Sequence, residues 1–201
     1  MSIVFLNQKF IPSEEAKISP MDRGFLFGDG VYEVLPSYDG EIIGFDLHID
    51  RLKTNMSAVG ISLSWTHQKW LEICKTLIEK NGFGSLGVYL HVSRGSEPVR
   101  SHSYADGIDP TVFVFSFKIP PEQIVCKSQI VPYRVSTSLD LRWSRCQIKA
   151  TSLLGNVMHF QQGQQDGFDE TLLFNDKDEL REGSTCNVYI VKNGVVITPP
   201  L

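Results

Sequence analysis

SLDLRWSRCQIKATSLLGNVM, at residues 138–158, is the most informative stretch in this chain of 201 residues. Within it Lys149 lies between two apolar residues, and the sequence holds no carboxylate between Asp140 and Asp166. Desolvation of a lysine without a sequence-local ion-pair partner disfavours its charged form, and an uncharged amine is a nucleophile. An ordinary surface lysine before a helix is the alternative interpretation. Lys149 is therefore the first candidate for a chemical role.

Composition and charge are those of an ordinary globular protein with a sizeable core. The chain is 42% hydrophobic with a formal net charge of -4, and its 19 basic residues are dispersed, so we expect neither nucleic acid nor a membrane surface as a partner. No apolar run reaches membrane-spanning length, and the N-terminus lacks the pattern of a signal peptide. The four cysteines form no C-x-x-C pair. We therefore expect a cytoplasmic protein without disulfides or a metal site.

The hydrophobic pattern predicts clusters of strands and helices without regular β-α-β alternation, which is typical of the α+β class. The strongest local signal is the turn Asp39-Gly40 between two alternating strands. Paired prolines at positions 120 and 121 predict a linker, because proline continues neither a helix nor a strand ladder. We therefore expect two domains, residues 1–119 and 120–201. Strands are predicted at 3–6, 10–11, 31–38, 41–45, 86–93, 111–118, 130–136, 170–174, 187–191 and 195–198, and helices at 46–60, 66–80 and 152–166.

Two motifs in the second half of the chain resemble one family. The stretch around Lys149 resembles the active-site region of the fold-type IV (class IV) pyridoxal-phosphate-dependent aminotransferases, whose Schiff-base lysine precedes a helix rich in small and apolar residues. Residues 182–187, EGSTCN, resemble the same family's E-[GA]-[ST]-x-x-N signature. The resemblance implies that Lys149 is catalytic and that Glu182 faces the ring nitrogen of pyridoxal 5'-phosphate. It also implies that Ser184, Thr185 and Asn187 bind this cofactor.

Two further motifs lie in the first half of the chain. Residues 23–33, RGFLFGDGVYE, resemble the family's block at the start of an active-site strand, in which alternation puts Tyr32 and Val34 on one face, toward the substrate. The stretch HIDRL, at 48–52, resembles a motif whose arginine contacts the cofactor phosphate, so the resemblance gives Arg51 that role. Without the resemblance, the glycines would indicate only a tight turn, and Arg51 a solvated helix face.

A long polar loop is predicted at 94–110, and it carries the most specific pattern. Residues 93–102, SRGSEPVRSH, resemble a segment of the D-amino-acid transaminases whose arginine and histidine, with the strand tyrosine, trap the substrate carboxylate. The resemblance therefore implies that Arg100 and His102 bind substrate together with Tyr32. Val99 is an insertion relative to the commonest spacing. Plain solvated charge on a loop is the alternative interpretation of the two residues.

The family resemblance implies an enzyme that moves the amino group of a D-amino acid to a 2-oxo acid by a ping-pong Schiff-base mechanism. It also implies a homodimer with a smaller N-terminal domain and a larger, β-rich C-terminal domain. Members of the family continue beyond the position of Leu201, so we expect the second domain to be incomplete in this sequence. Two alternatives stay open. One is 4-amino-4-deoxychorismate lyase, which uses the same lysine and glutamate, and the other is a non-catalytic binding module of the same fold.

Overall fold

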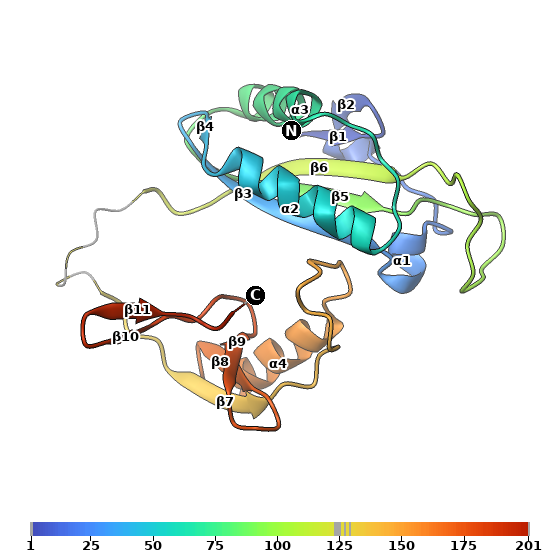
Figure 1. Cartoon of the computed structure of the whole chain (residues 1–201). Helices are drawn as coiled ribbons and strands as arrows, with labels where there is room; N and C mark the ends of the chain where they lie inside the picture. Colours follow the sequence, from blue (N-terminus) through green and yellow to red (C-terminus); the bar gives the residue numbers. More distant parts are fainter. Residues whose placement is uncertain (1, 123–125, 127, 129, 201) are drawn as a thin grey trace. The chain divides into compact units, whose positions relative to one another are not determined.

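The computed structural model describes residues 2–122, 126, 128 and 130–200, and Figure 1 shows its helices and strands. The chain divides into two compact units. Unit 1 comprises Met1–Gln123 and Ile148–Ser152, and unit 2 comprises Ile124–Gln147 and Leu153–Leu201. The segment with Lys149 thus belongs to unit 1, although it follows the predicted linker. Among the described residues, no helix is both long and apolar enough to cross a membrane.

Unit 1 is built on a six-stranded sheet in the order β2-β1-β6-β5-β3-β4, and every described pairing in it is antiparallel. The predicted tight turn at Asp39-Gly40 is confirmed, and a second tight turn lies between β1 and β2. Asn7 and Gln8 have φ of 43° and 75°, and Asp39 and Gly40 have φ of 48° and 92°, which suits two-residue hairpins because this backbone matches the twist of the strands. The strands are β1 (Ile3–Leu6), β2 (Lys9–Pro12), β3 (Gly30–Tyr38), β4 (Glu41–Ile42), β5 (Ser85–Ser93) and β6 (Thr111–Lys118).

Helices α2 (Phe45–Ala58) and α3 (His67–Asn81) cover one face of this sheet (Figure 1). Their apolar side chains form the core with those of β3, β5 and β6; Leu52 and Trp70 are completely buried. Burial of such side chains stabilises the fold by about 2 kcal/mol each. Both helices were predicted, and Thr66 caps α3 by accepting a hydrogen bond from the N–H of Lys69 at 3.1 Å.

The start of α2 differs from the prediction. We expected a strand over 41–45 followed by a helix capped by Asp46. Instead β4 ends at Ile42, and Gly44, with φ of 65°, precedes the first helical residue without any side-chain cap. The left-handed conformation of Gly44 breaks the strand, so the helix begins at Phe45, one residue earlier than expected.

The segment with Lys149 is hydrogen-bonded to the edge of β3. The N–H of Tyr32 donates to the carbonyl of Lys149 at 3.0 Å, and the N–H of Thr151 donates to the carbonyl of Gly30 at 2.9 Å. This edge is open because β4 pairs only with the far end of β3. A Cβ on Gly30 would lie 2.9 Å from the carbonyl oxygen of Val92 and 3.2 Å from Oγ1 of Thr151. A side chain at this position would therefore clash with β5 and crowd Thr151, so glycine suits both neighbours of β3.

Unit 2 contains a three-stranded sheet in the order β7-β8-β9, the helix α4 and a separate hairpin. The predicted strand 170–174 is confirmed, and so is the helix, within two residues of its expected ends. The strand expected at 130–136 lies instead at β7, because the polar run VSTSL pairs in parallel with β8. One strand, β9, was not predicted. The elements are β7 (Val135–Leu139), α4 (Leu154–Gln165), β8 (Glu170–Phe174), β9 (Leu180–Gly183), β10 (Ile190–Lys192) and β11 (Val195–Ile197).

The α+β class is confirmed, since the strands of unit 1 pair antiparallel and its two long helices, α2 and α3, cover one face of the sheet. The domain boundary after residue 119 stays a prediction. Ile148–Ser152 belong to unit 1, although they follow this boundary in the sequence. Lys149 is therefore hydrogen-bonded to the sheet of unit 1 through its backbone.

Candidate active site

Lys149 is half-buried, and its Nζ lies 4.2 Å from the centroid of the Tyr32 ring. That ring stacks on Tyr89, with 5.4 Å between centroids, and burial raises the pKa of Tyr89 to about 12, which keeps its hydroxyl neutral. No hydrogen bond or ion pair of the Lys149 amine occurs within the described part of the chain. The amine thus lies over the face of the Tyr32 ring, and no carboxylate of the described residues forms an ion pair with it.

Alternation along β3 separates two kinds of side chain. Tyr32 and Val34 are half-buried, whereas Val31, Glu33 and Leu35 are fully buried, with Val31 and Leu35 part of the core beneath the helices. The two residues predicted to face the substrate therefore share the face of the sheet away from α2 and α3.

Arg51 lies on α2 and makes a two-pronged ion pair with Glu33. Its Nε is 2.6 Å from Oε1, and its Nη2 is 2.8 Å from Oε2. His48, one helical turn earlier, places Nδ1 2.8 Å from Oε2 of the same carboxylate. Burial alone would raise the pKa of Glu33, but the hydrogen bonds from Arg51 and His48 outweigh it and hold that pKa below its ordinary value. Nη1 of Arg51 has no partner among the described residues, so it remains available to an anion.

The Glu33→Gln variant is expected to lose about 2 kcal/mol of unfolding free energy at pH 7, because an uncharged amide with one acceptor oxygen replaces a buried carboxylate that accepts from both Arg51 and His48. The depressed pKa of Glu33 gives the sign of the pH dependence. The wild-type advantage is complete above the ordinary value of 4.5 and shrinks as the pH falls from there through the lower folded pKa. Urea unfolding from pH 7 to pH 3 measures it. Glu79→Gln, on the exposed face of α3, is the control; equal stability of the Glu33 variant and the wild type at pH 7 would contradict the expectation.

In unit 2, Glu182 is paired with Arg142. Arg142 is 6% exposed and forks onto Asp140, with Nε 2.9 Å from Oδ1 and Nη2 2.8 Å from Oδ2, while Nη1 donates to Oε1 of Glu182. The hydrogen bond from Arg142 is the main cause of the lowered pKa of Asp140. Oε2 of Glu182 has no partner in the described residues. Oε1 of Glu182 is therefore held by Arg142, and Oε2 can accept a hydrogen bond from another donor.

Glu170 binds the predicted cofactor residues Ser184 and Thr185. Both hydroxyl groups donate to its carboxylate, as do the backbone N–H groups of Thr171, Ser184 and Thr185. Burial alone would raise the pKa of Glu170, but these hydrogen bonds lower it. The hydroxyl hydrogens of Ser184 and Thr185 are therefore already donated to Glu170. Asn187 is exposed beyond β9.

Arg100 and His102 lie on the loop between β5 and β6, and both contact the ring of Phe27. Cζ of Arg100 is 4.8 Å from the centroid of the Phe27 ring, and the His102 ring is 5.4 Å from it, centroid to centroid. Both side chains are exposed. Across the described residues, no hydrogen bond, ion pair or ring contact joins either of them to Tyr32 or Lys149. Among the described residues, the two side chains predicted to bind substrate thus share a contact with Phe27 but have none with Tyr32 or Lys149.

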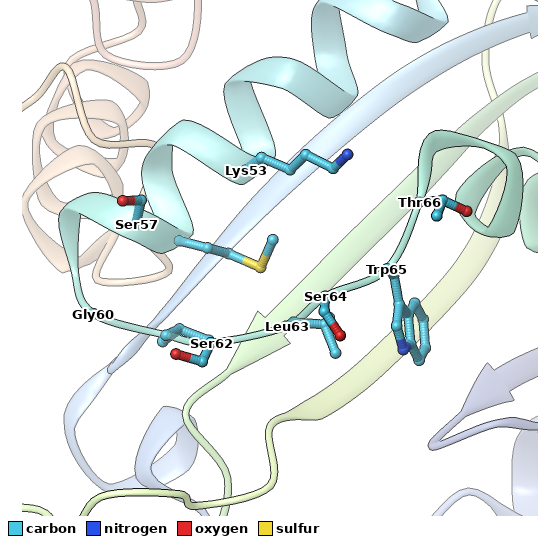
Figure 2. Close-up of a pocket in the computed structure, with 10 residues that line it drawn as sticks. Lys53, Ser57, Gly60, Ser62, Leu63, Ser64, Trp65 and Thr66 are labelled. Atoms are coloured by element: carbon cyan, nitrogen blue, oxygen red, sulfur yellow. The ribbon is translucent and has the colours of Figure 1, made fainter.

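A pocket of about 570 Å³ lies elsewhere in unit 1, where α2 ends and the connection to α3 begins. Figure 2 shows Lys53 and Ser57 on the helix, and Ser62 and Ser64 on the segment that follows it. Nζ of Lys53 is 2.9 Å from Nδ1 of His67. No predicted site residue lines this pocket.

Sequence reasoning missed four side chains that hold the predicted ones in place: Glu33, His48, Arg142 and Glu170. The spacing of His48 and Arg51, three residues apart on a predicted helix, was the one available signal that both face the same way. The other partners are far apart in sequence, so no local pattern could have linked them.

The donor groups fit the cofactor that the resemblance implies. Lys149 has an unpaired amine that could attack an aldehyde carbon. Nη1 of Arg51 has no partner among the described residues and could donate to a phosphate. Oε2 of Glu182 likewise has none there and could accept from a protonated ring nitrogen. Each is fixed by neighbours in its own unit. The roles of these residues and of the others predicted from sequence stay proposals.

Comparisons with known proteins agree with one another. The model of the family described as amino-transferase class IV matches residues 30–201. A D-alanine aminotransferase from Staphylococcus epidermidis is 34% identical over 100% of this chain and 70% of its own length, and one from Bacillus licheniformis is 36% identical over 98% and 68%. The crystal structure of a branched-chain aminotransferase from Thermoproteus uzoniensis matches with a TM-score of 0.86 at 22% identity, over 99% of this chain and 68% of that one. At that identity the structural likeness bears on the fold alone.

Proposed function

We propose a function from the premise that the chain belongs to the class IV aminotransferases, which act with pyridoxal 5'-phosphate. The proposed reaction moves the amino group of a D-amino acid, such as D-alanine, to a 2-oxo acid, such as 2-oxoglutarate. The observation that carries the reaction type is the unpaired Lys149 amine over Tyr32, on a segment fastened to β3. The D-amino-acid preference is supported by relatives that are themselves D-alanine aminotransferases.

The bound cofactor supplies an aldehyde that takes up the amino group and a ring that accepts the electron pair left when the α-proton is removed. The residues of this chain do the rest. Lys149 would hold the cofactor aldehyde, and its Nζ would serve as the base that takes the proton from the substrate α-carbon. Glu182 is proposed as the residue that would hold the cofactor ring nitrogen in its protonated form, through its second carboxylate oxygen. Arg51, oriented by Glu33, binds the phosphate.

The substrate carboxylate is assigned to Arg100 and His102, with the hydroxyl of Tyr32. A guanidinium, an imidazole and a phenol provide both charge-assisted and neutral donors to one carboxylate. Binding of this end fixes which face of the α-carbon meets Lys149, and thereby the stereochemistry. Val34, on the same face of β3 as Tyr32, borders the substrate side chain.

We further propose a homodimer that acts in the cytoplasm. The proposal of a dimer rests on the family resemblance, in which each site is built partly from the neighbouring subunit. All four cysteines of the chain are free, which suits a reducing compartment. Sedimentation tests the assembly: a mass twice that of the 22.6 kDa chain is expected, and a single-chain mass at all concentrations would oppose it.

A coupled assay tests the reaction. With pyridoxal phosphate, D-alanine and 2-oxoglutarate, the protein is expected to form pyruvate and D-glutamate in equal amounts, and L-alanine is expected to give neither. Incubation with aminodeoxychorismate alone is the second arm. Pyruvate released there, without glutamate in the first arm, would replace the proposal with the lyase reaction. A protein that takes up no cofactor would indicate a binding module instead.

A further inference from the structure

We propose that helix α1 (Arg23–Phe27) positions Arg100 and His102 as one pair for the substrate carboxylate, acting through Arg23 and Phe27. The inference rests on the proposed function, because it takes these two residues to bind that carboxylate. Arg23 and Phe27 are positioning residues: they act on the loop between β5 and β6 and touch no reacting atom.

Arg23 is the main tie between α1 and this loop. Its side chain is 6% exposed, and a buried guanidinium must satisfy its donors within the protein. Most of its partners come from the loop, where it bonds to three consecutive backbone carbonyls and to a carboxylate. The backbone on both sides of His102 is thereby fixed. The acceptors are Ser101 O at 2.7 Å, His102 O at 3.1 Å, Ser103 O at 3.3 Å, Glu97 Oε2 at 3.1 Å and, outside the loop, Asp29 Oδ2 at 2.9 Å.

Phe27 contacts both members of the pair. Cζ of Arg100 and the ring of His102 lie 4.8 Å and 5.4 Å from its ring centroid, and Arg23 itself lies 4.9 Å from it. Neither Arg100 nor His102 has an ion-pair partner within the described ranges, and both are exposed. The Phe27 ring is therefore the one side chain that both of these otherwise unpaired residues contact among the described residues.

Two further residues, Glu97 and Arg94, tie the loop to itself and to the sheet. Glu97 accepts from Arg23 through one oxygen and from the N–H of Ala105 through the other, at 3.1 Å. Near the base of the loop, Cζ of Arg94 lies 3.7 Å from the Tyr104 ring, and its guanidinium forks onto Asp29 at 2.8 Å and 2.9 Å. Asp29 thus joins Arg94 to Arg23. The long connection between β5 and β6 is thus tied to α1 and to the end of the sheet at several points along its length.

This arrangement has a direct consequence for substrate affinity. Binding of a small carboxylate by a mobile loop costs the entropy of ordering that loop, whereas a loop already held by α1 avoids that cost. Loss of the contacts between α1 and the loop should therefore weaken substrate binding more than it slows the chemical step, which depends on Lys149 and Glu182.

The test compares Phe27→Ala with Phe25→Ala, two residues earlier on α1, where the side chain is 70% exposed and has no ring contact with the loop among the described residues. Phe27→Ala is expected to raise the KM for D-alanine about tenfold while kcat changes less than about twofold. It is also expected to speed amide hydrogen exchange at residues 99–105, with cofactor absorbance and melting temperature preserved. Phe25→Ala is expected to change neither KM nor loop exchange.

Outcomes of this comparison separate the two proposals. Faster exchange without a rise in KM would overturn the carboxylate role of the pair, and unchanged exchange would overturn the positioning role of α1. A wild-type protein inactive toward every D-amino acid would defeat the proposed function, while hydrogen exchange would still report whether α1 holds the loop. Glu97→Gln is the second variant if Phe27→Ala does not fold. It is expected to raise the KM for D-alanine about threefold and to speed exchange in the loop, because the ion pair between Glu97 and Arg23 is lost.

Discussion

Replacement of Lys149 by alanine is expected to lower the rate of amino transfer about 10⁴-fold or more, because one side chain both attaches the cofactor and carries the α-proton. The fold should survive, since the segment is fastened to β3 through the backbone of Lys149 and Thr151, whose N–H and carbonyl groups the substitution leaves in place. The rate of pyruvate formation from D-alanine, measured in a single turnover, reports the loss.

Lys69→Ala is the matched control, since Lys69 is an exposed lysine of α3 in the same unit. Its activity should equal that of the wild type. A Lys149→Ala protein within tenfold of wild-type activity, with its melting temperature unchanged, would show that another group moves the proton.

Substitution of Glu182 by glutamine is expected to lower kcat about 10²- to 10³-fold, the usual cost of removing one electrostatic contact to the developing charge. A neutral amide cannot keep the ring nitrogen protonated, so the ring accepts electrons less readily. Stability should change little, because Arg142 keeps its two-pronged pair with Asp140 when Glu182 is neutralised. Steady-state kinetics with D-alanine, together with denaturant unfolding, measures the two effects separately.

Glu179→Gln, an exposed carboxylate in the turn that precedes β9, is the control for Glu182. It should leave kcat unchanged. A Glu182→Gln protein with normal kcat, or one that loses activity only because it unfolds, would remove Glu182 from the assigned role.

The elements of unit 1 were predicted well because their signals are local. Turns such as Asp39-Gly40 and the cap at Thr66 depend on a few adjacent residues, and the spacing of Ile49, Leu52 and Met56 alone indicates a helix face. Where prediction failed, the cause was non-local. β9 reads LREG, whose charged residues disfavour a strand, and it forms only because β8 is there to pair with it.

The same division holds for the site. Motifs pointed to Lys149, Glu182 and Arg51 because each lies in a recognisable stretch. The groups that orient them could not be found this way: Glu33 meets Arg51 from a strand, and Arg142 meets Glu182 across 40 positions of sequence. Such contacts depend on how strands and helices pack, which a linear pattern does not contain.

The attachment of the cofactor to Lys149 is the central claim, and one experiment tests it directly. The protein is loaded with pyridoxal phosphate, reduced with borohydride, digested and analysed by mass spectrometry. The account predicts that the cofactor mass is fixed on the peptide containing Lys149 and on no other lysine. A label on a different lysine, such as Lys53 beside the pocket of Figure 2, or no label at all, would contradict it.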